Sequence, residues 1–100
     1  MINDKVTQIF MDIADLLQVQ SESIFRVRAY QRAAEVIKGM PQDLAELYKK
    51  DEDALEEIPG VGAELKLKII DIIKTGTTPM YEELVKKLGP GVLQMLRVRG

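Results

Sequence analysis

Hydrophobic residues recur at helical spacing along most of the chain. Between residues 3 and 17 the apolar positions fall on one face of a helix, and Asn3 is a typical N-cap residue at its start. A second apolar stripe follows Ser23, another N-cap residue, and ends at Gly39 and Pro41. No alternating run of apolar and polar residues and no β-hairpin turn signal interrupts the pattern. The sequence therefore predicts an all-α domain.

Shorter helical patterns fill the second half of the chain. Asp43 is the predicted N-cap of a short helix, and Thr78, with proline at the first helical position, begins another that ends at Gly89. Residues 92–96 are predicted to form a final turn. Together these segments indicate a single compact domain of about four to six short helices that cross one another at steep angles.

Residues 53–75 have the pattern of two helical arms joined by a glycine turn. The acidic first arm turns Leu55 and Ile58 toward the core. The turn, Ile58-Pro59-Gly60-Val61-Gly62, opens directly into a second helix that ends at Gly76. The apolar positions of this second helix, at i, i+4, i+7 and i+8, are Leu65, Ile69, Ile72 and Ile73. Such a pair of arms resembles the helix-hairpin-helix, a motif that grips a nucleic-acid backbone without reading its bases.

The turn also has the chemistry of an anion site. The first N–H groups of a helix have no partner inside it, and they add to the positive end of its dipole. The glycines at positions 60 and 62 remove the side chains that would keep a phosphate away from this backbone. The alternative is a helix–helix corner that needs glycine only for its conformation. The pattern favours phosphate binding, and the predicted residues are Gly60, Val61, Gly62, Ala63 and Glu64.

The composition limits the chemistry. The chain has no cysteine, which excludes disulfides and thiolate metal sites, and no histidine, which is the commonest general base and zinc ligand. Any catalysis therefore falls to Lys, Asp, Glu, Tyr or the backbone. No Asp-x-Asp pair has a suitable metal-binding partner, so the sequence predicts no catalytic metal site.

Charge and hydropathy limit the partners. Fourteen basic and sixteen acidic side chains leave a net charge of −2, which argues against a broad charge-driven grip on DNA. Any nucleic-acid binding must be local. The start of the chain lacks a basic segment followed by an apolar one, and no 18 apolar residues run together. We therefore expect a soluble, unexported protein with no membrane partner.

Three stretches together point to one family. They are Ile13-Ala14-Asp15-Leu16-Leu17, then Phe25-Arg26-Val27-Arg28-Ala29-Tyr30-Gln31-Arg32-Ala33-Ala34, then the glycine turn with Lys68-Ile69 and Thr75-Gly76. Across nearly the whole chain they resemble the N-terminal domain of family X DNA polymerases, the DNA polymerase beta group, in its bacterial and archaeal form. The resemblance implies a monomeric cytoplasmic domain, residues 1–100, that binds the 5′-phosphate side of gapped or nicked DNA in base excision repair.

The resemblance also implies what lies outside this domain. The polymerase carboxylates and their Mg²⁺ belong to a separate region, the remainder of the polymerase chain, so residues 1–100 are not expected to synthesise DNA. A weak internal echo agrees with a longer parent, because residues 95–100 repeat the apolar spacing of residues 55–60. Residues 92–100 are interpreted as the start of a second, truncated hairpin, in which Arg97 and Arg99 would bind phosphate.

Further contacts follow from the resemblance residue by residue. Arg26 and Tyr30 match positions that would bind DNA phosphate. The backbone carbonyls of Glu56, Ile58 and Val61 would hold a monovalent cation, Na⁺ or K⁺, which is the one cofactor expected in this segment. That local positive charge would help a slightly acidic chain to attract a phosphate.

Lys68 occupies the position of the nucleophile with which some family members remove a 5′-deoxyribose phosphate through a Schiff base. An amine attacks only when deprotonated, whereas Glu64 at i−4 and Asp71 at i+3 both favour its charged form. An exposed helix salt bridge is the competing interpretation. Strong lyases also have basic residues where Glu64 and Met80 stand, and a histidine where Phe25 stands, so this chain departs from them at three positions.

Two further questions stay open. On a helical wheel Arg26 lies beside Tyr30 on the inward side, whereas Arg28 and Arg32 point outward. Arg28 and Arg32 are predicted to form a solvated face or to make an ion pair with Glu35. The alternative is that they contact DNA or the rest of the polymerase. The predicted topology is also that of sterile-alpha-motif domains, which bind proteins and self-associate through helix ends. A protein-interaction domain is therefore a further alternative.

Overall fold

All regular structure in the described part of the chain is helical. The computed structural model describes residues 1–98, without the side chains of Pro90, Arg97 and Val98. In chain order the elements are α1 (Ile2–Val19), α2 (Ile24–Lys38), α3 (Leu44–Lys50), the 3₁₀ helix η1 (Glu52–Glu57), α4 (Ala63–Thr75), α5 (Pro79–Leu88) and α6 (Pro90–Val98). The all-α prediction is confirmed. None of these helices is long and apolar enough to cross a membrane.

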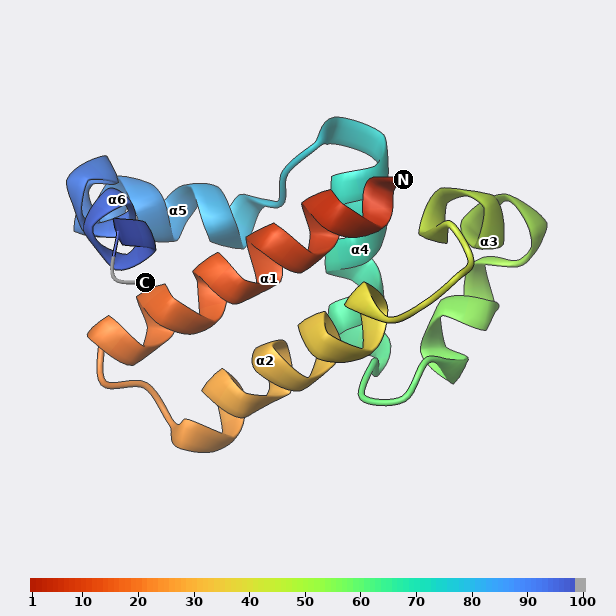
Figure 1. Cartoon of the computed structure of the whole chain (residues 1–100), viewed down its shortest axis with the longest axis horizontal. Coiled ribbons are helices and arrows are strands. Elements are labelled where there is room, and N and C mark those ends of the chain that lie inside the picture. Colours follow the sequence, from red (N-terminus) through yellow and green to blue (C-terminus); the bar gives the residue numbers. More distant parts are fainter. Residues whose placement is uncertain (99–100) are drawn as a thin grey trace.

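Helix α1 is the centre of the fold. It lies alongside the antiparallel α2 and also contacts α3, α4, α5 and α6 (Figure 1). The inward faces of the helices meet in one apolar core. In this core Phe10 of α1 and Tyr30 of α2 pack edge to face, with ring centroids 5.4 Å apart. The α1–α2 pair thus fixes the helix that carries Arg26, Tyr30 and Arg32.

Local capping signals set several helix ends as predicted. The Ser23 side chain accepts a hydrogen bond from the Phe25 N–H, and the Asp43 side chain accepts one from the Ala45 N–H. Gly76 ends α4 in the left-handed conformation with a φ of 85°, which a residue without a Cβ adopts freely. These ends are readable from the sequence because each cap and its partner lie within a few residues of one another.

The predicted N-cap role of Asn3 is wrong. Helix α1 begins at Ile2 with Met1 at the N-cap position, so Asn3 lies in the first turn, and only 3% of its surface is exposed. The Asn3 side-chain amide donates to the Gln42 carbonyl at 2.7 Å, and its side-chain oxygen accepts from the Leu44 N–H at 2.8 Å. This side chain therefore ties α1 to the start of α3 instead of capping its own helix.

Three other helix details differ from the sequence prediction. The final turn predicted at residues 92–96 is part of α6, a helix of 9 residues. In α4 Ile70 is buried and Ile73 only partly so, which makes the apolar stripe wider than predicted. Thr78 holds the N-cap position of α5 without a side-chain capping bond, because its hydroxyl donates to the Asp71 carboxylate at 3.3 Å.

Candidate nucleic-acid interface

The hairpin, formed by η1, residues 58–62 and α4, is closed by its own backbone. The Val61 N–H donates to the Ile58 carbonyl oxygen at 2.9 Å, and both side chains are buried in the core. Gly60, between them, has a φ of 86°, a region that a Cβ makes unfavourable. Two buried anchors and one glycine conformation therefore fix the turn.

The N-terminus of α4 is open. Gly62 holds the N-cap position with no side-chain capping bond, and a Cβ added there would meet nothing within 4 Å. Gly62, Ala63 and Glu64 are exposed, and within residues 1–98 their N–H groups donate to no acceptor. Internal capping of these donors would have excluded the predicted phosphate contact. The structure leaves them available.

Lysine side chains of α4 are paired with carboxylates beside the turn. Lys66 Nζ lies 3.2 Å from Asp53 Oδ1 and 3.5 Å from Glu56 Oε2, so it joins the two arms of the hairpin. The hydrogen bond to Asp53 is the main cause of a raised pKa at Lys66. Lys68 Nζ lies 3.6 Å from Glu64 Oε1. The two Lys66 pairs offset part of the negative potential that the acidic arm would present to a phosphate.

Arg32 of α2 lies beside the turn, a placement that the sequence analysis missed. A Cβ added to Gly60 would lie 3.6 Å from Arg32 Cγ and 3.8 Å from its Nε. The predicted pairing with Glu35 is absent, since no ion pair within the described residues joins it to Arg28 or Arg32. Both arginines are exposed, as the alternative of a solvated face predicts. No local signal could have placed Arg32 at the hairpin, because the contact joins segments far apart in the sequence.

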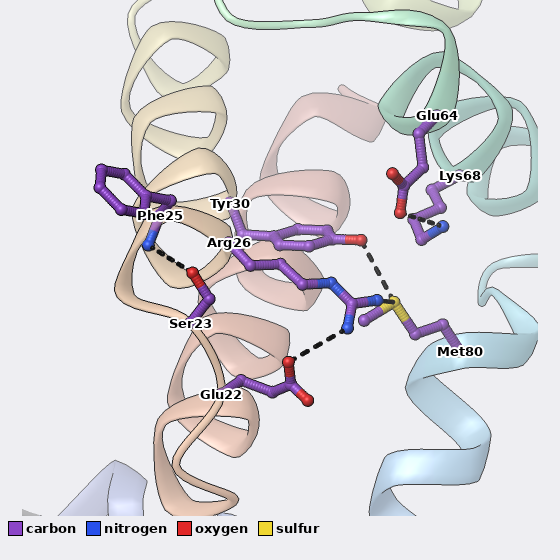
Figure 2. Close-up of polar contacts among 8 residues, drawn as sticks. All are labelled: Glu22, Ser23, Phe25, Arg26, Tyr30, Glu64, Lys68 and Met80. Carbon is purple, nitrogen blue, oxygen red and sulfur yellow. Dashed lines mark hydrogen bonds and ion pairs between the residues drawn. The ribbon is translucent and has the colours of Figure 1, made fainter.

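Arg26, Tyr30 and Lys68 gather near Met80 and Glu64, as Figure 2 shows. The Tyr30 hydroxyl donates to the Met80 sulfur at 3.2 Å, and Arg26 Nη2 reaches the same sulfur at 4.0 Å. Tyr30 is buried, whereas Arg26 remains exposed. The structure thus brings a cation, a hydroxyl and an amine from α2 and α4 to one place, with a thioether from α5 between them.

The contacts of Lys68 are those of a salt bridge. Its side chain is 16% exposed and pairs with Glu64 one turn earlier. A carboxylate beside an amine favours the charged form of the amine, whereas a Schiff base needs the neutral form. The other predicted neighbour, Asp71, accepts a hydrogen bond from Thr78. Phe25, where the resemblance leads one to expect a histidine in strong lyases, is 79% exposed and points away from the cluster in Figure 2.

The Tyr30 hydroxyl makes stability depend on pH in the alkaline range. Burial raises its pKa above the ordinary value of 10, and Glu64 adds to the rise, whereas Arg26 lowers it. Above pH 10 the unfolded chain loses this proton and the folded protein keeps it. The free energy of unfolding should therefore fall as pH rises, by up to about 1.4 kcal/mol per pH unit, and be unaffected by this group below that range. Urea titrations from about pH 9 to 11 should show a shallower decline in Tyr30→Phe. Equal declines would contradict the expectation.

Some predicted groups are not described. Arg99 lies outside the described residues and the Arg97 side chain is not described, so their predicted phosphate contacts stay predictions. The cation site at the backbone carbonyls of Glu56, Ile58 and Val61 likewise stays a prediction. Within the described residues, no group of three or more His, Cys, Asp or Glu side chains is placed to hold a metal ion.

The fold and the hairpin define a class of small helical domain with an open helix N-terminus at a glycine turn. A family model described as a helix-hairpin-helix domain matches residues 1–78. The chain belongs to the helix-hairpin-helix domain family, a membership that suggests nucleic-acid binding. The match extends from α1 through α4, so the family unit includes the α1–α2 pair as well as the hairpin. No curated protein sequence matches the chain.

Proposed function

We propose that the protein is a DNA-binding domain that grips the phosphate backbone through its hairpin, without sequence preference. The observation that carries the proposal is the uncapped, exposed N-terminus of α4 at Gly62 in a helix-hairpin-helix chain. The N–H groups of Gly62, Ala63 and Glu64 would donate to phosphate oxygens at the positive end of the helix dipole. Backbone donors that touch only phosphates carry no base information, so binding would not depend on sequence.

We further propose that this domain belongs to a family X repair polymerase and holds the 5′-phosphate side of gapped or nicked DNA. The support is a second group of polar side chains away from the turn, where Arg26 and Tyr30 both reach Met80 and Lys68 lies nearby. Arg26 Nη1 also pairs with the exposed Glu22 carboxylate at 3.7 Å, a contact that a phosphate would have to replace. A terminal phosphate carries more charge than a phosphodiester, so a guanidinium and a hydroxyl would favour it. DNA synthesis and its Mg²⁺ would belong to the rest of the polymerase chain.

A monovalent cation bound at the hairpin would also help the domain to hold a phosphate. The Ile58 carbonyl uses one lone pair for the Val61 N–H and keeps the other. The Glu56 and Val61 carbonyls accept no turn or loop hydrogen bond within residues 1–98. These three oxygens would hold Na⁺ or K⁺, which would supply positive charge to the phosphate at the hairpin.

The test is a titration with gapped duplex DNA, with and without a 5′-phosphate, followed by amide shifts. We expect shifts at residues 60–65, tighter binding of the phosphorylated gap, and a log–log salt slope of about −2 to −3 for two or three phosphate contacts. Unchanged amides at residues 60–65 would contradict hairpin binding and favour a protein-interaction domain of the sterile-alpha-motif type. Equal affinity for both duplexes would overturn the 5′-phosphate assignment alone.

Lyase chemistry is the alternative for Lys68. Its case rests on the grouping of Lys68 with Arg26 and Tyr30 (Figure 2), and the ion pair with Glu64 at 3.6 Å opposes it. Borohydride trapping on a preincised abasic duplex distinguishes the two functions, because a lyase would form a cross-link that Lys68→Ala abolishes.

A further inference from the structure

A groove that contains two arginines lies between α1 and α2. Its volume is about 540 Å³, and its lining residues are Met11, Arg28, Gln31, Arg32 and Glu35. Arg28 and Arg32 are one turn apart, about 6 Å along the axis of α2, and both are exposed. The function proposed above uses neither side chain.

Arg32 makes this groove continuous with the hairpin turn. Its aliphatic stem lies against Gly60, where an added Cβ would come within 3.6 Å of Cγ and 3.8 Å of Nε. Gly60 in turn is two residues from the open N-cap position of α4. Arg32 therefore places a positive charge beside the turn that leads into the backbone donors that we assign to phosphate.

Neither guanidinium group forms an ion pair with a carboxylate of the described residues. Within the described residues, Arg26, Lys66 and Lys68 form ion pairs, whereas Arg28 and Arg32 form none. Glu35 lines the same groove without pairing with either. An arginine in this state presents a planar fork of donors that matches two oxygens of one phosphate.

We infer that Arg32 and Arg28 extend the phosphate site of the hairpin onto α2, so that the bound strand continues along this groove. The inference rests on the proposed function and adds to it the path of the strand and two residues that bind it. The ligand is the phosphodiester backbone, because the groove offers guanidinium donors and its lining residues include no aromatic ring on which a base would stack.

The test uses substitutions that remove charge and keep the aliphatic stem. Arg32→Met and Arg28→Met should each raise the Kd for 5′-phosphorylated gapped DNA about threefold to fivefold. Each should also reduce the salt slope by about 0.9, as expected for one lost phosphate contact. Lys38→Met removes the same charge from an exposed position at the end of the same helix and should have a much smaller effect. Fluorescence anisotropy at several salt concentrations gives both quantities.

A strand with one neutral methylphosphonate, moved along position by position, locates the contact. At one position of the strand, the methylphosphonate should weaken binding by the wild type but should not weaken binding by Arg32→Met any further. Arg32→Lys should recover the salt slope, which guards against an effect on folding. The inference is overturned if Arg32→Met binds DNA as Lys38→Met does and is weakened by methylphosphonates at the same positions as the wild type. The proposed function would still stand in that case, provided that DNA shifts the amides at the hairpin. If the wild type binds no DNA, both are overturned.

Discussion

Asn3→Ala is expected to lower the free energy of unfolding by about 2 to 3 kcal/mol, because it leaves two backbone groups without partners. The Asn3 side chain holds the Gln42 carbonyl at 2.7 Å and the Leu44 N–H at 2.8 Å. The Leu44 N–H lies at the buried start of α3, where water does not replace the lost acceptor. Urea denaturation of the wild type and the variant measures the difference.

Two further substitutions show whether hydrogen bonds cause this loss. Lys5→Ala, at an exposed position of the same helix, should change stability by less than about 0.5 kcal/mol. Asn3→Asp keeps an acceptor for the Leu44 N–H but sets a carboxylate against the Gln42 carbonyl. Asn3→Asp should therefore be less stable than the wild type at neutral pH. Its stability should recover as the pH falls, because the protonated carboxyl group can donate to the Gln42 carbonyl. A stability of Asn3→Ala within about 0.5 kcal/mol of the wild type would show that this side chain is no structural tether.

The Asn3 tether matters for the interface because α3 connects the α1–α2 pair to the hairpin. Helix α3 contacts both η1 and α4, which are the two arms of the hairpin. A loosened α3 would therefore loosen the elements that carry the turn. Stability and DNA binding should decline together in Asn3→Ala, whereas a substitution confined to the turn should separate them.

Local chemistry explains why so much of this fold is predictable from the sequence. The Ser23 and Asp43 caps and the left-handed Gly76 involve bonds or dihedral angles within a few residues. The apolar spacing in α1, α2 and α4 follows from the helical period alone. The glycine turn is also local, since its hydrogen bond joins Ile58 to Val61.

Tertiary contacts explain what the sequence could not predict. Asn3 is a residue type that favours N-caps and also serves as a buried donor and acceptor, and only its partners near α3 decide between the two roles. The exposure of Arg32 follows from a helical wheel, but its place beside Gly60 does not, because a wheel shows one helix and not the hairpin that lies next to it. The ion pairs of Lys66 could not be predicted either, because its partners Asp53 and Glu56 lie on the opposite arm of the hairpin.

Gly62→Val is expected to weaken binding of gapped DNA at least tenfold while leaving the fold intact. Gly62 has φ −92° and ψ −171°, an extended conformation that valine adopts readily, and a Cβ there meets nothing within 4 Å. Stability should therefore change by less than about 1 kcal/mol. The new side chain would occupy the space through which a phosphate reaches the N–H groups of α4. Each lost charge-assisted hydrogen bond costs about 1.5 to 3 kcal/mol, and 1.4 kcal/mol is tenfold in affinity.

The matched control is Gly91→Val in α6, which lies at the end of the molecule away from the hairpin (Figure 1). A Cβ at Gly91 also meets nothing within 4 Å, so this variant tests the same chemical change without covering the donors. It should bind DNA within about twofold of the wild type, as expected for a surface change that leaves the N–H donors of α4 uncovered. Anisotropy gives the affinities and urea denaturation the stabilities. Undiminished binding by a folded Gly62→Val would mean that the open end of α4 is not where the protein holds phosphate, because a branched side chain cannot share that space with a phosphate group.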